Sequence, residues 1–353
     1  MAATFLENLT INPENIRDLR ELLQVGFEAQ NLADYARVNQ VRNGDPFGII
    51  GDLSDVGVEG SGCDPEYAGA EIENTQKRWE LGDWQIPLKI CYTDMEGTAA
   101  EYAFKNGTPI GDLNGTDIMT YVVYPALDRA LRKMWWRISW FGNTAADTIS
   151  NGGVLTNGTD TSLFTITDGF WKKLFAITTA DPLKQTAIAA NSGATYAAQK
   201  AAILTAGAAT GAIDSLLFDA DPRITASDDA VLMMTKSLAD AFTLDLKNKY
   251  NNILPWEEVF SGVRVAQYNG VRVVSVAEWD NVINTYENDG TKWNLPYRAV
   301  LTRANNLHVG VTTEGLVNDL DVWFEKKERR MYIYGTGKIG TMIPVDDFVQ
   351  VGF

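Results

Sequence analysis

The chain has 353 residues, 45% of them hydrophobic, and its 30 basic and 46 acidic side chains give a formal net charge of −16. A chain of this length and composition can bury a large core, and the length favours about two domains. The excess of acid disfavours sequence-specific recognition of nucleic acid, because phosphate backbones would be repelled over most of the surface. The same excess is an ordinary route to solubility.

Membrane and secreted proteins are disfavoured by the distribution of apolar residues. The chain contains no run of about 18 apolar residues, and residues 1–20 lack the basic start and apolar core of a secretory signal. We therefore expect neither insertion into a membrane nor secretion through a signal peptide. The cysteines are Cys63 and Cys91, and two in so long a chain predict reduced thiols rather than a disulfide scaffold.

The first part of the chain predicts a helix, a loop region and a hairpin. Asn12 can cap a helix over residues 13–27, whose apolar side chains recur on one face. Residues 41–73 are rich in glycine and aspartate, which indicates irregular chain. Residues 79–92 alternate apolar and polar side chains around a Gly-Asp turn, so they predict a long hairpin, and Pro87 marks an edge strand.

A longer helix is predicted from Thr116 or Asp117 to Phe141. Its apolar stripe consists of Leu127, Leu131, Met134 and Ile138. Arg129, Lys133 and Arg137 recur every four residues and form a basic stripe in an acidic chain, for which a solvated or ion-paired helix face is the ordinary interpretation. The aromatic residues of this helix indicate a core or an interface, and they are Trp135, Trp136 and Trp140.

The second half of the chain mixes helices and strands. Residues 196–218 form an alanine-rich helical tract in which Gly207 and Gly211 have the small-x-x-x-small spacing of close helix packing. Residues 230–235, AVLMMT, predict a buried strand that leads into a helix. In residues 263–276, two valine-rich alternating runs are joined by Asn-Gly, which predicts a hairpin with a type I′ turn.

The C-terminal stretch predicts a last hairpin and contains a glycine pattern. Val322 and Phe324 are expected to meet Met331 and Ile333 across a charged turn. The glycines that follow match the G-x-G-x-x-G pattern of dinucleotide sites, and they are Gly335, Gly337 and Gly340.

That glycine pattern binds pyrophosphate only where a helix follows the turn, and it needs an acid about 20 residues further on. Residues 341–353 instead contain Pro344 and several β-branched side chains. We therefore expect no nucleotide cofactor. In or beside strands, such glycines permit bulges, bends or a close approach of the backbone.

Catalytic and metal-binding patterns are not found in the sequence. His308 is the one histidine, so we expect neither a zinc site nor a multi-histidine metal site, and we expect it to be a hydrogen-bonded structural residue. Carboxylate pairs could support hydrolysis, and the candidates are Asp219 with Asp221 and Asp228 with Asp229. Both pairs lie in turn-like stretches, where aspartate caps helices and closes turns. We therefore expect no enzyme, no cofactor and no metal.

The order of these features resembles the major capsid protein of tailed double-stranded-DNA bacteriophages, a fold shared with encapsulins. The phrases that carry the likeness are YNGVRVVSV, which looks like a strand of the axial domain, and DVWFEKKERRMYIYGTGKIGTMIP, which looks like the terminal hairpin and last strand. The resemblance implies an α+β fold with an N-terminal arm, an extended hairpin loop, a peripheral domain with a long spine helix, and an axial domain. The implied bounds are 1–40 for the arm, 71–94 for the extended hairpin loop, 151–305 for the axial domain, and 41–70, 95–150 and 306–353 for the peripheral domain.

This resemblance implies a structural protein that assembles into the hexamers and pentamers of an icosahedral phage head around double-stranded DNA. Implied partners are further copies of the chain, a scaffolding protein, a portal and decoration proteins, with assembly in the bacterial cytoplasm and a place in the virion. Some relatives crosslink a hairpin lysine, but nothing identifies a partner for Lys77 or Lys89, and we predict no crosslink. Candidate contacts between subunits are Trp79, Trp84, Arg129, Lys133 and Arg137.

Two other functions remain open on the sequence. An encapsulin-like compartment would share the fold and enclose protein cargo in place of DNA. A carboxylate-dependent hydrolase with an α+β fold would need paired acids in a cleft and a monomer or small oligomer. The absence of a long charged helical segment before residue 1 further implies a separate scaffolding protein or a segment removed earlier.

Overall fold

The computed structural model describes residues 36–53, 72–91, 124–250, 256–260, 263–312, 320–325, 327–328 and 330–353. The helix predicted at residues 13–27, the start of the long helix and Cys63 lie outside the described residues. Helices and mixed sheets combine in an α+β fold, as the sequence predicted. The strands form a seven-stranded sheet, a five-stranded sheet and a two-stranded ribbon.

The seven-stranded sheet joins segments that are far apart in the sequence. Its order is β5 (Gln185–Thr186), β14 (Val349–Gly352), β10 (Ala299–Arg303), β6 (Ala230–Thr235), β9 (Val271–Val276), β8 (Val263–Tyr268) and β7 (Glu257–Phe260). β14 belongs to residues 306–353, which were expected to return to the peripheral domain with the long helix; Val349 and Val351 of β14 pack in the same core as α2, and the domain bounds stay a prediction. β14 pairs antiparallel with β10 and parallel with β5, so the end of the chain completes the seven-stranded sheet.

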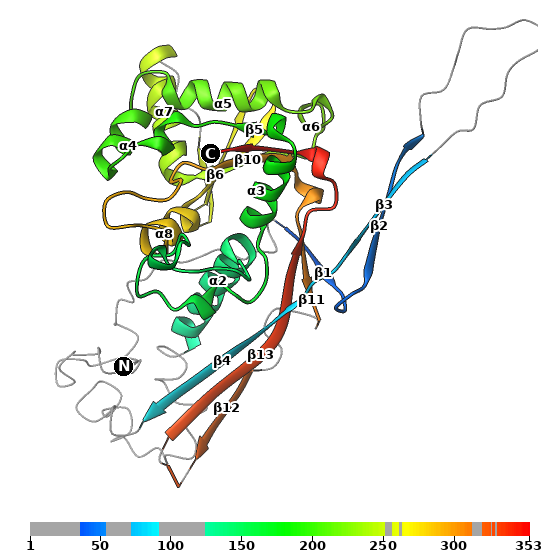
Figure 1. Cartoon of the computed structure of the whole chain (residues 1–353), viewed down its shortest axis with the longest axis vertical. Coiled ribbons are helices and arrows are strands. Elements are labelled where there is room, and N and C mark those ends of the chain that lie inside the picture. Colours follow the sequence, from blue (N-terminus) through cyan, green and yellow to red (C-terminus); the bar gives the residue numbers. More distant parts are fainter. Residues whose placement is uncertain are drawn as a thin grey trace, which may run out of the picture.

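The helices cover both faces of this sheet, as Figure 1 shows. They are α2 (Tyr124–Phe141), α3 (Phe170–Ala180), α4 (Tyr196–Ile203), α5 (Ala208–Asp219), α6 (Pro222–Thr225), α7 (Lys236–Tyr250) and α8 (Ala277–Tyr286). Alternate residues of β6 enter two separate cores: Met233 packs in the core that includes α2, α3 and α8, and Leu232 packs in the core that includes α5 and α7. Every residue of β6 is buried, as predicted for a strand covered on both faces.

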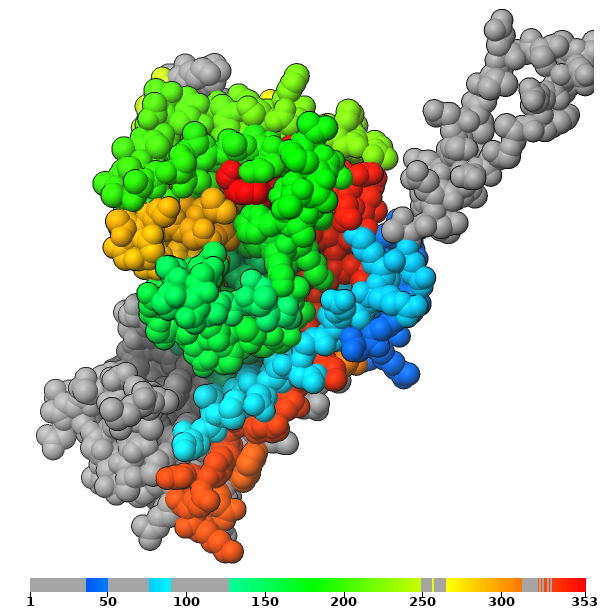
Figure 2. All heavy atoms as spheres, viewed as in Figure 1, coloured from blue at the N-terminus to red at the C-terminus, as the bar shows by residue number. Residues whose placement is uncertain are grey.

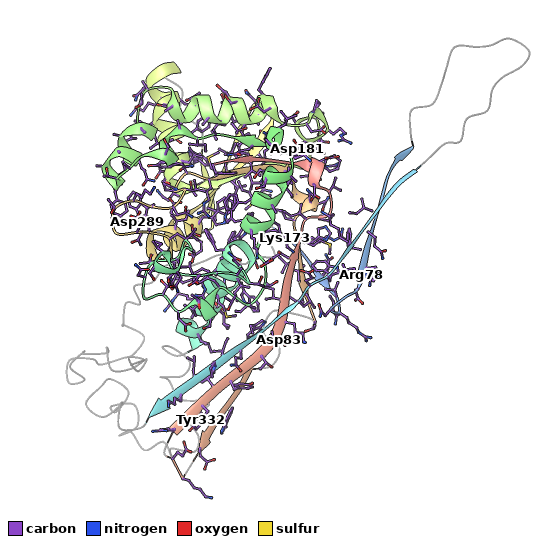
Figure 3. The ribbon with its side chains drawn as sticks, viewed as in Figure 1. Arg78, Asp83, Lys173, Asp181, Asp289 and Tyr332 are labelled. Carbon is purple, nitrogen blue, oxygen red and sulfur yellow. The ribbon has the colours of Figure 1, made fainter. Side chains whose placement is uncertain are left out.

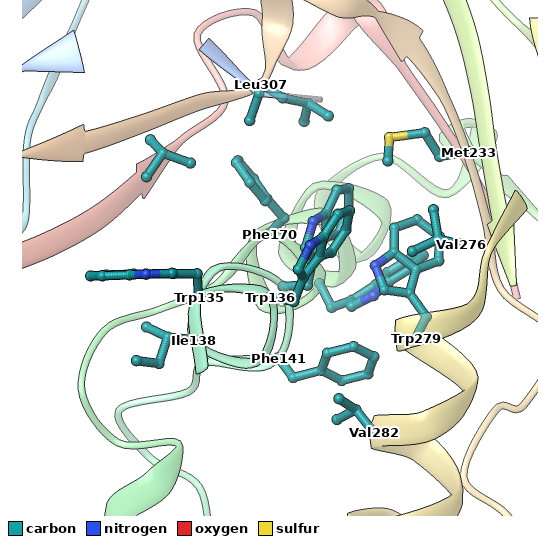
Figure 4. Close-up of a cluster of buried hydrophobic side chains, with 14 of the residues drawn as sticks. Trp135, Trp136, Ile138, Phe141, Phe170, Met233, Val276, Trp279, Val282 and Leu307 are labelled. Atoms are coloured by element: carbon teal, nitrogen blue, oxygen red, sulfur yellow. The ribbon is translucent and has the colours of Figure 1, made fainter. Parts of the chain in front are cut away.

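The first core contains an aromatic cluster around Trp140 of α2. Figure 4 shows Phe170 and Trp279 among its buried side chains. The ring centroid of Trp140 lies 4.4 Å from Trp279, 4.9 Å from Phe170 and 5.7 Å from Trp171. These side chains come from α2, α3 and α8, so one cluster joins three helices. Trp135 and Trp136 are also buried, so all three tryptophans of this helix belong to the core of the subunit.

The five-stranded sheet lies beside this domain and carries the ribbon. Its order is β1 (Arg37–Gln40), β11 (His308–Val311), β13 (Arg330–Met342) and β12 (Leu320–Glu325), and β4 (Gly82–Cys91) pairs with β13 on the side opposite β12. Within the described residues β4 has a ladder with β13 alone, so it is the edge strand that Pro87 predicted. The ribbon consists of β2 (Pro46–Leu53) and β3 (Ile72–Arg78).

The hairpin predicted around Gly82-Asp83 is wrong in its pairing. β3 pairs antiparallel with β2, and β4 pairs antiparallel with β13 over Gly82 to Cys91. Of the two predicted runs, Trp79 and Leu81 lie between strands, whereas the run that begins at Trp84 forms β4. The extended hairpin is formed by β2 and β3, so part of the region predicted as irregular, 46–53, is a strand.

Two local predictions are confirmed. β8 and β9 form a hairpin in which Asn269 and Gly270 have φ of 48° and 80°, as a type I′ turn requires. In the last hairpin Val322 lies opposite Ile333 and Phe324 opposite Met331. Both regions were set by turn residues and strict alternation, which are local signals.

The alanine-rich tract is two helices rather than one. α4 ends at Ile203 and α5 begins at Ala208, with Gly207 at φ 82° between them. A Cβ on Gly207 or Gly211 would meet nothing within 4 Å, so the close packing predicted for these glycines is not present. Within the described residues no single helix is long and apolar enough to cross a membrane. α4 and α5 pass that test only as a pair, bent by 71°.

Candidate functional site

The β2–β3 ribbon is the feature that most separates this chain from a compact domain, and Figure 1 shows it pointing away from the rest of the molecule. Pro46 pairs with Arg78 and Ile50 with Asn74, and the ladder continues past a bulge to Leu53 and Ile72. An isolated two-stranded ribbon is marginally stable in water. The ribbon therefore depends on its base and on whatever covers its faces.

The base of the ribbon is tied to the end of the chain by polar and aromatic contacts. Lys77 Nζ donates to the Ile343 carbonyl at 2.7 Å and forms an ion pair with Asp346 at 2.7 Å. Phe47 meets the ring of His308 edge-on at 5.2 Å. Contacts from both strands therefore set the direction in which the ribbon leaves the sheet.

His308 has the structural role predicted for it. Its Nδ1 lies 2.7 Å from Asn39 Nδ2, and its Nε2 lies 2.9 Å from the carbonyl oxygen of Asn305. Since the carbonyl accepts only, Nε2 carries the proton and Nδ1 accepts from Asn39. Burial lowers the pKa of His308, which keeps the ring neutral. The histidine thus joins β1 to the turn before β11.

Trp79 and Trp84 are both buried within the chain, at 2% and 7% exposure. Trp79 lies against Gly310 of β11, where a Cβ would come within 2.6 Å of the indole. Trp84 packs edge-on against Trp135 of α2, with ring centroids 5.1 Å apart. Each indole therefore has a packing role inside the subunit. A part in contacts between subunits stays a prediction for both.

The glycine pattern lies inside β13 and explains how Trp84 fits. A Cβ on Gly337 would lie 2.6 Å from the indole of Trp84, and a Cβ on Gly340 would lie 2.3 Å from the carbonyl oxygen of Glu80. Distances this short cannot be accommodated without movement of the backbone or the indole. The glycines therefore provide close approach between strands, as the sequence predicted, and the helical segment that follows them is the three-residue 3-10 turn Asp346–Phe348.

The opposite face of the same sheet exposes aromatic side chains. Residues opposite each other in a ladder share a face, and Lys89, Tyr332 and Trp323 form one such row. Trp323 stacks on Tyr332 with ring centroids 5.5 Å apart, and Trp323 and Tyr334 remain 45% and 39% exposed. We call Trp323, Tyr332 and Tyr334 the aromatic strip. Figure 2 shows β4 and β13 running along the surface toward the end of the molecule where β12 lies.

The basic stripe of α2 has an acidic partner inside the chain that the sequence did not indicate. Glu278 in the first turn of α8 is 4% exposed, and the charges of Lys133 and Arg137 act on it. Arg137 lies over the ring of Phe164 at 5.7 Å and donates to the Leu163 carbonyl. Lys133 and Arg137 therefore face the interior of the subunit. A role of Arg129, Lys133 and Arg137 between subunits stays a prediction.

Burial raises the pKa of Glu278 to about 7, even though the two cations of α2 act in the other direction. One carboxyl oxygen accepts from Asn281 at 3.4 Å, and the other has no hydrogen-bond partner among the described residues. Burial likewise raises the pKa of Asp280 to about 6, although it accepts from the backbone N–H groups of Lys236 and Ser237 at the start of α7. α8 thus carries two acids, on either side of Trp279, whose pKa values are raised.

One member of each acid pair makes structural contacts, and for Asp221 the contact is the predicted helix cap. Asp221 caps α6 by accepting from the N–H of Arg223 at 2.7 Å. Asp229 accepts from Arg303 Nε at 2.9 Å and also bonds Ser227, and these contacts help to hold its pKa below the ordinary value. A groove of about 360 Å³ is lined in part by Asp228 and Asp229. Asp229 already forms an ion pair with Arg303.

Metal binding receives no support from the described part of the chain. It contains no group of three or more histidine, cysteine, aspartate or glutamate side chains arranged to hold an ion.

No family model and no curated protein matches the sequence. Solved structures do match it over nearly the whole chain. The structure of Mycobacterium phage Ogopogo has a TM-score of 0.51 at 12% identity, covering 94% of this chain and 94% of that chain. Gordonia phage Cozz has a TM-score of 0.51 at 11% identity, covering 96% and 90%. The procapsid of satellite phage P4 has a TM-score of 0.47 at 12% identity, covering 92% and 94%.

These similarities define the fold. The structures of phages Ogopogo and Cozz match with TM-scores of 0.51 over at least 90% of both chains, and the chain has the tailed-phage major capsid fold. The fold predicted from the order of sequence features is therefore confirmed. The projecting ribbon, the long α2 helix and the separate seven-stranded sheet are the parts of this chain that give it that shape.

Proposed function

We propose that this chain is the major capsid protein of a tailed phage and assembles into hexamers and pentamers of an icosahedral shell that encloses double-stranded DNA. The observation that carries the proposal is the β2–β3 ribbon on a subunit with the capsid fold. The ribbon is anchored at Lys77 and Phe47 and extends away from the body. A ribbon of two strands gains stability by packing on another surface.

The aromatic strip supports the same function. Aromatic side chains are enriched in protein interfaces, and an exposed apolar patch beside charged residues is a common mark of such a contact. Trp323 and Tyr334 lie on the side of the sheet opposite to the one that packs on α2. They are therefore available to a neighbouring subunit without disturbing the core.

The charge of the chain suits a container. With a net charge of −16, the subunit has little general attraction for phosphate, so densely packed DNA need not adhere to the wall. Further partners under this proposal are a scaffolding protein, a portal and decoration proteins, with assembly in the host cytoplasm. The role is structural and not enzymatic.

Electron microscopy of the purified protein tests the proposal. Closed shells of uniform diameter are the expected result, and particles from infected or producing cells should contain double-stranded DNA and a portal at one vertex. Shells that contain protein cargo and no portal would indicate an encapsulin-like compartment instead. A monomer or small oligomer at every protein and salt concentration would contradict both shell functions.

A further inference from the structure

Large apolar side chains are exposed at the C-terminal end of α5. Phe218 is 89% exposed, and Leu183 in the turn Pro182–Lys184 is 83% exposed. A network holds the two segments together: Thr186 donates to Asp219 at 3.3 Å, and Gln350 Nε2 donates to the Leu183 carbonyl and to Thr186 Oγ1, both at 3.1 Å. We call Leu183 and Phe218 the Phe218 patch.

A second exposed apolar pair lies at the N-terminal end of the same helix. Leu204, at the end of α4 just before α5, is 55% exposed, and Leu244 of α7 is 42% exposed. Leu244 is close to this end because its neighbour Asp245 accepts from the N–H groups of Ala209 and Thr210 at 3.0 and 3.2 Å. We call Leu204 and Leu244 the Leu204 patch.

The two patches are separated by the length of α5. Its 12 residues, at ~1.5 Å of rise each, place them roughly 15 Å or more apart along the helix axis. Figure 1 shows α4 and α7 toward one end of α5 and α6 at the other, and Asp181, next to Leu183, is labelled at the α6 end in Figure 3. The patches therefore lie at opposite ends of one domain.

The two ends also differ in charge. The acids beside the Phe218 patch are Asp181, Asp219, Asp221 and Asp347. They outnumber the cations of that end, Lys184 and Arg223. Beside the Leu204 patch the exposed ionisable side chains include Lys200 and Lys247, whereas Asp245 is buried by its capping role and Asp240 is paired with Lys236. Among these described side chains, acids outnumber cations by four to two at the Phe218 end, and cations outnumber acids by three to two at the Leu204 end.

We propose that the Phe218 patch of one copy of this chain packs against the Leu204 patch of the next copy. Apolar surface meets apolar surface in this contact, and acidic residues of one end meet lysines of the other, which favours a second copy of the chain as the partner. Because the patches differ, the contact is head-to-tail, and such contacts close into rings when the rotation between copies allows it. This inference rests on the proposed shell function and assigns a surface to it.

Assembly of patch variants tests the contact. The double variants Leu183→Ser/Phe218→Ser and Leu204→Ser/Leu244→Ser should each fold, since their side chains are exposed, and should each raise the protein concentration needed for shells about tenfold or more. Val154→Ser is the matched control, because Val154 is 43% exposed and belongs to neither patch. Shell yield is measured by light scattering and electron microscopy, and folding by circular dichroism.

Mixing the two double variants tests the head-to-tail geometry. Each retains the patch that the other lacks, so an equimolar mixture should form heterodimers, measured by analytical ultracentrifugation, in which further growth is blocked. If one double variant assembles like the wild-type chain while the other fails, the patches do not meet and the inference is wrong. If both assemble like wild type, the inference fails while the shell function stands. If the wild-type chain and the Val154→Ser control form no shells, the proposed function itself fails.

Discussion

The seven-stranded and five-stranded sheets of this chain are covered to different extents. Helices pack on both faces of the seven-stranded sheet, so neighbouring residues of β6 enter two separate cores. The five-stranded sheet packs on α2 through one face, and its other face exposes Trp323 and Tyr334. The first sheet is therefore buried on both faces, whereas the second leaves one face with exposed aromatic side chains, which the proposed shell function would use for contacts with neighbouring subunits.

The largest expected effect separates two tryptophans, one from each region. Trp279 is 0% exposed and contacts Trp140 and Trp171, whereas Trp323 is 45% exposed on the outer face. Trp279→Ala should lower the free energy of unfolding by about 3–5 kcal/mol, because it leaves a cavity in the core. Trp323→Ala should change it by about 0.5 kcal/mol or less. Urea unfolding followed by near-ultraviolet circular dichroism measures both, and equal losses would mean that the two regions do not differ as described.

A smaller effect is expected where the two regions meet. Gly337→Ala forces a methyl group to within 2.6 Å of the Trp84 indole, so it should lower the free energy of unfolding by about 1–3 kcal/mol. Gly48→Ala is the matched control in the ribbon, because a Cβ there meets nothing within 4 Å and its φ is not positive. The control should be neutral or stabilise by up to about 1 kcal/mol. Loss of stability in the control and not in Gly337→Ala would refute this account of the glycines.

A pH-dependent effect is expected at the junction of α2 and α8. Because the pKa of Glu278 is about 7 in the folded chain and near its ordinary value when unfolded, the folded state binds the proton more tightly. Stability contributed by the protonated group is present below about pH 4.5 and is lost as the pH rises to about 7. Glu278→Gln should remove this dependence and stabilise the chain above pH 7 by about 1–3 kcal/mol.

The measurement is the free energy of unfolding of both proteins from pH 4 to pH 8. Subtracting the two curves isolates the contribution of Glu278 to the pH dependence. Asp280 has a raised pKa that acts in the same direction, but it is present in both proteins and cancels. Two results would contradict a raised pKa of Glu278. One is a pair of parallel curves, and the other is a variant that is less stable than wild type at pH 8, because Lys133 and Arg137 have lost their acid.

The smallest effect is expected for an ion pair on the outer face of the five-stranded sheet. Asp83 and Lys338 are 2.9 Å apart, and their side chains are 75% and 47% exposed. Exposed pairs contribute about 0–1 kcal/mol, so Asp83→Asn should leave thermal unfolding of the subunit nearly unchanged. A loss of several degrees would show that this face contributes more to the subunit than its exposure indicates.

Local signals predicted the elements that depend on neighbours in the sequence. Asn269-Gly270 determines a type I′ turn because both positions need positive φ, and the alternation of residues 322–333 determines the facing pairs of the last hairpin. The capping roles of Asp221 and the buried strand β6 were predicted on the same basis. His308 was predicted as structural because no second histidine exists to make a metal site.

The partners of the strands could not be predicted in this way. Residues 82–91 alternate as a strand, and the alternation gives a strand without its neighbour, whereas residues 72–78 form a strand without an alternating pattern. The pairing of β4 with β13 joins residues about 250 positions apart and depends on Gly337 and Gly340 leaving room for Trp84 and for the chain at Glu80. Similarly, β14 joins the seven-stranded sheet because its two partners, β10 and β5, are brought together only by the folded core.

The candidate contact residues also show which properties follow from the sequence and which follow from the tertiary structure. The sequence alone determined that the chain has tryptophans, a basic stripe and a net charge of −16, because these follow from residue identity. Only the tertiary structure decided that Trp79 and Trp84 are buried, that Lys133 and Arg137 face Glu278, and that the exposed aromatic residues are Trp323 and Tyr334. The physical reason is that burial depends on long-range packing: a side chain is covered or exposed according to which distant segment lies against it, and no local pattern records that segment.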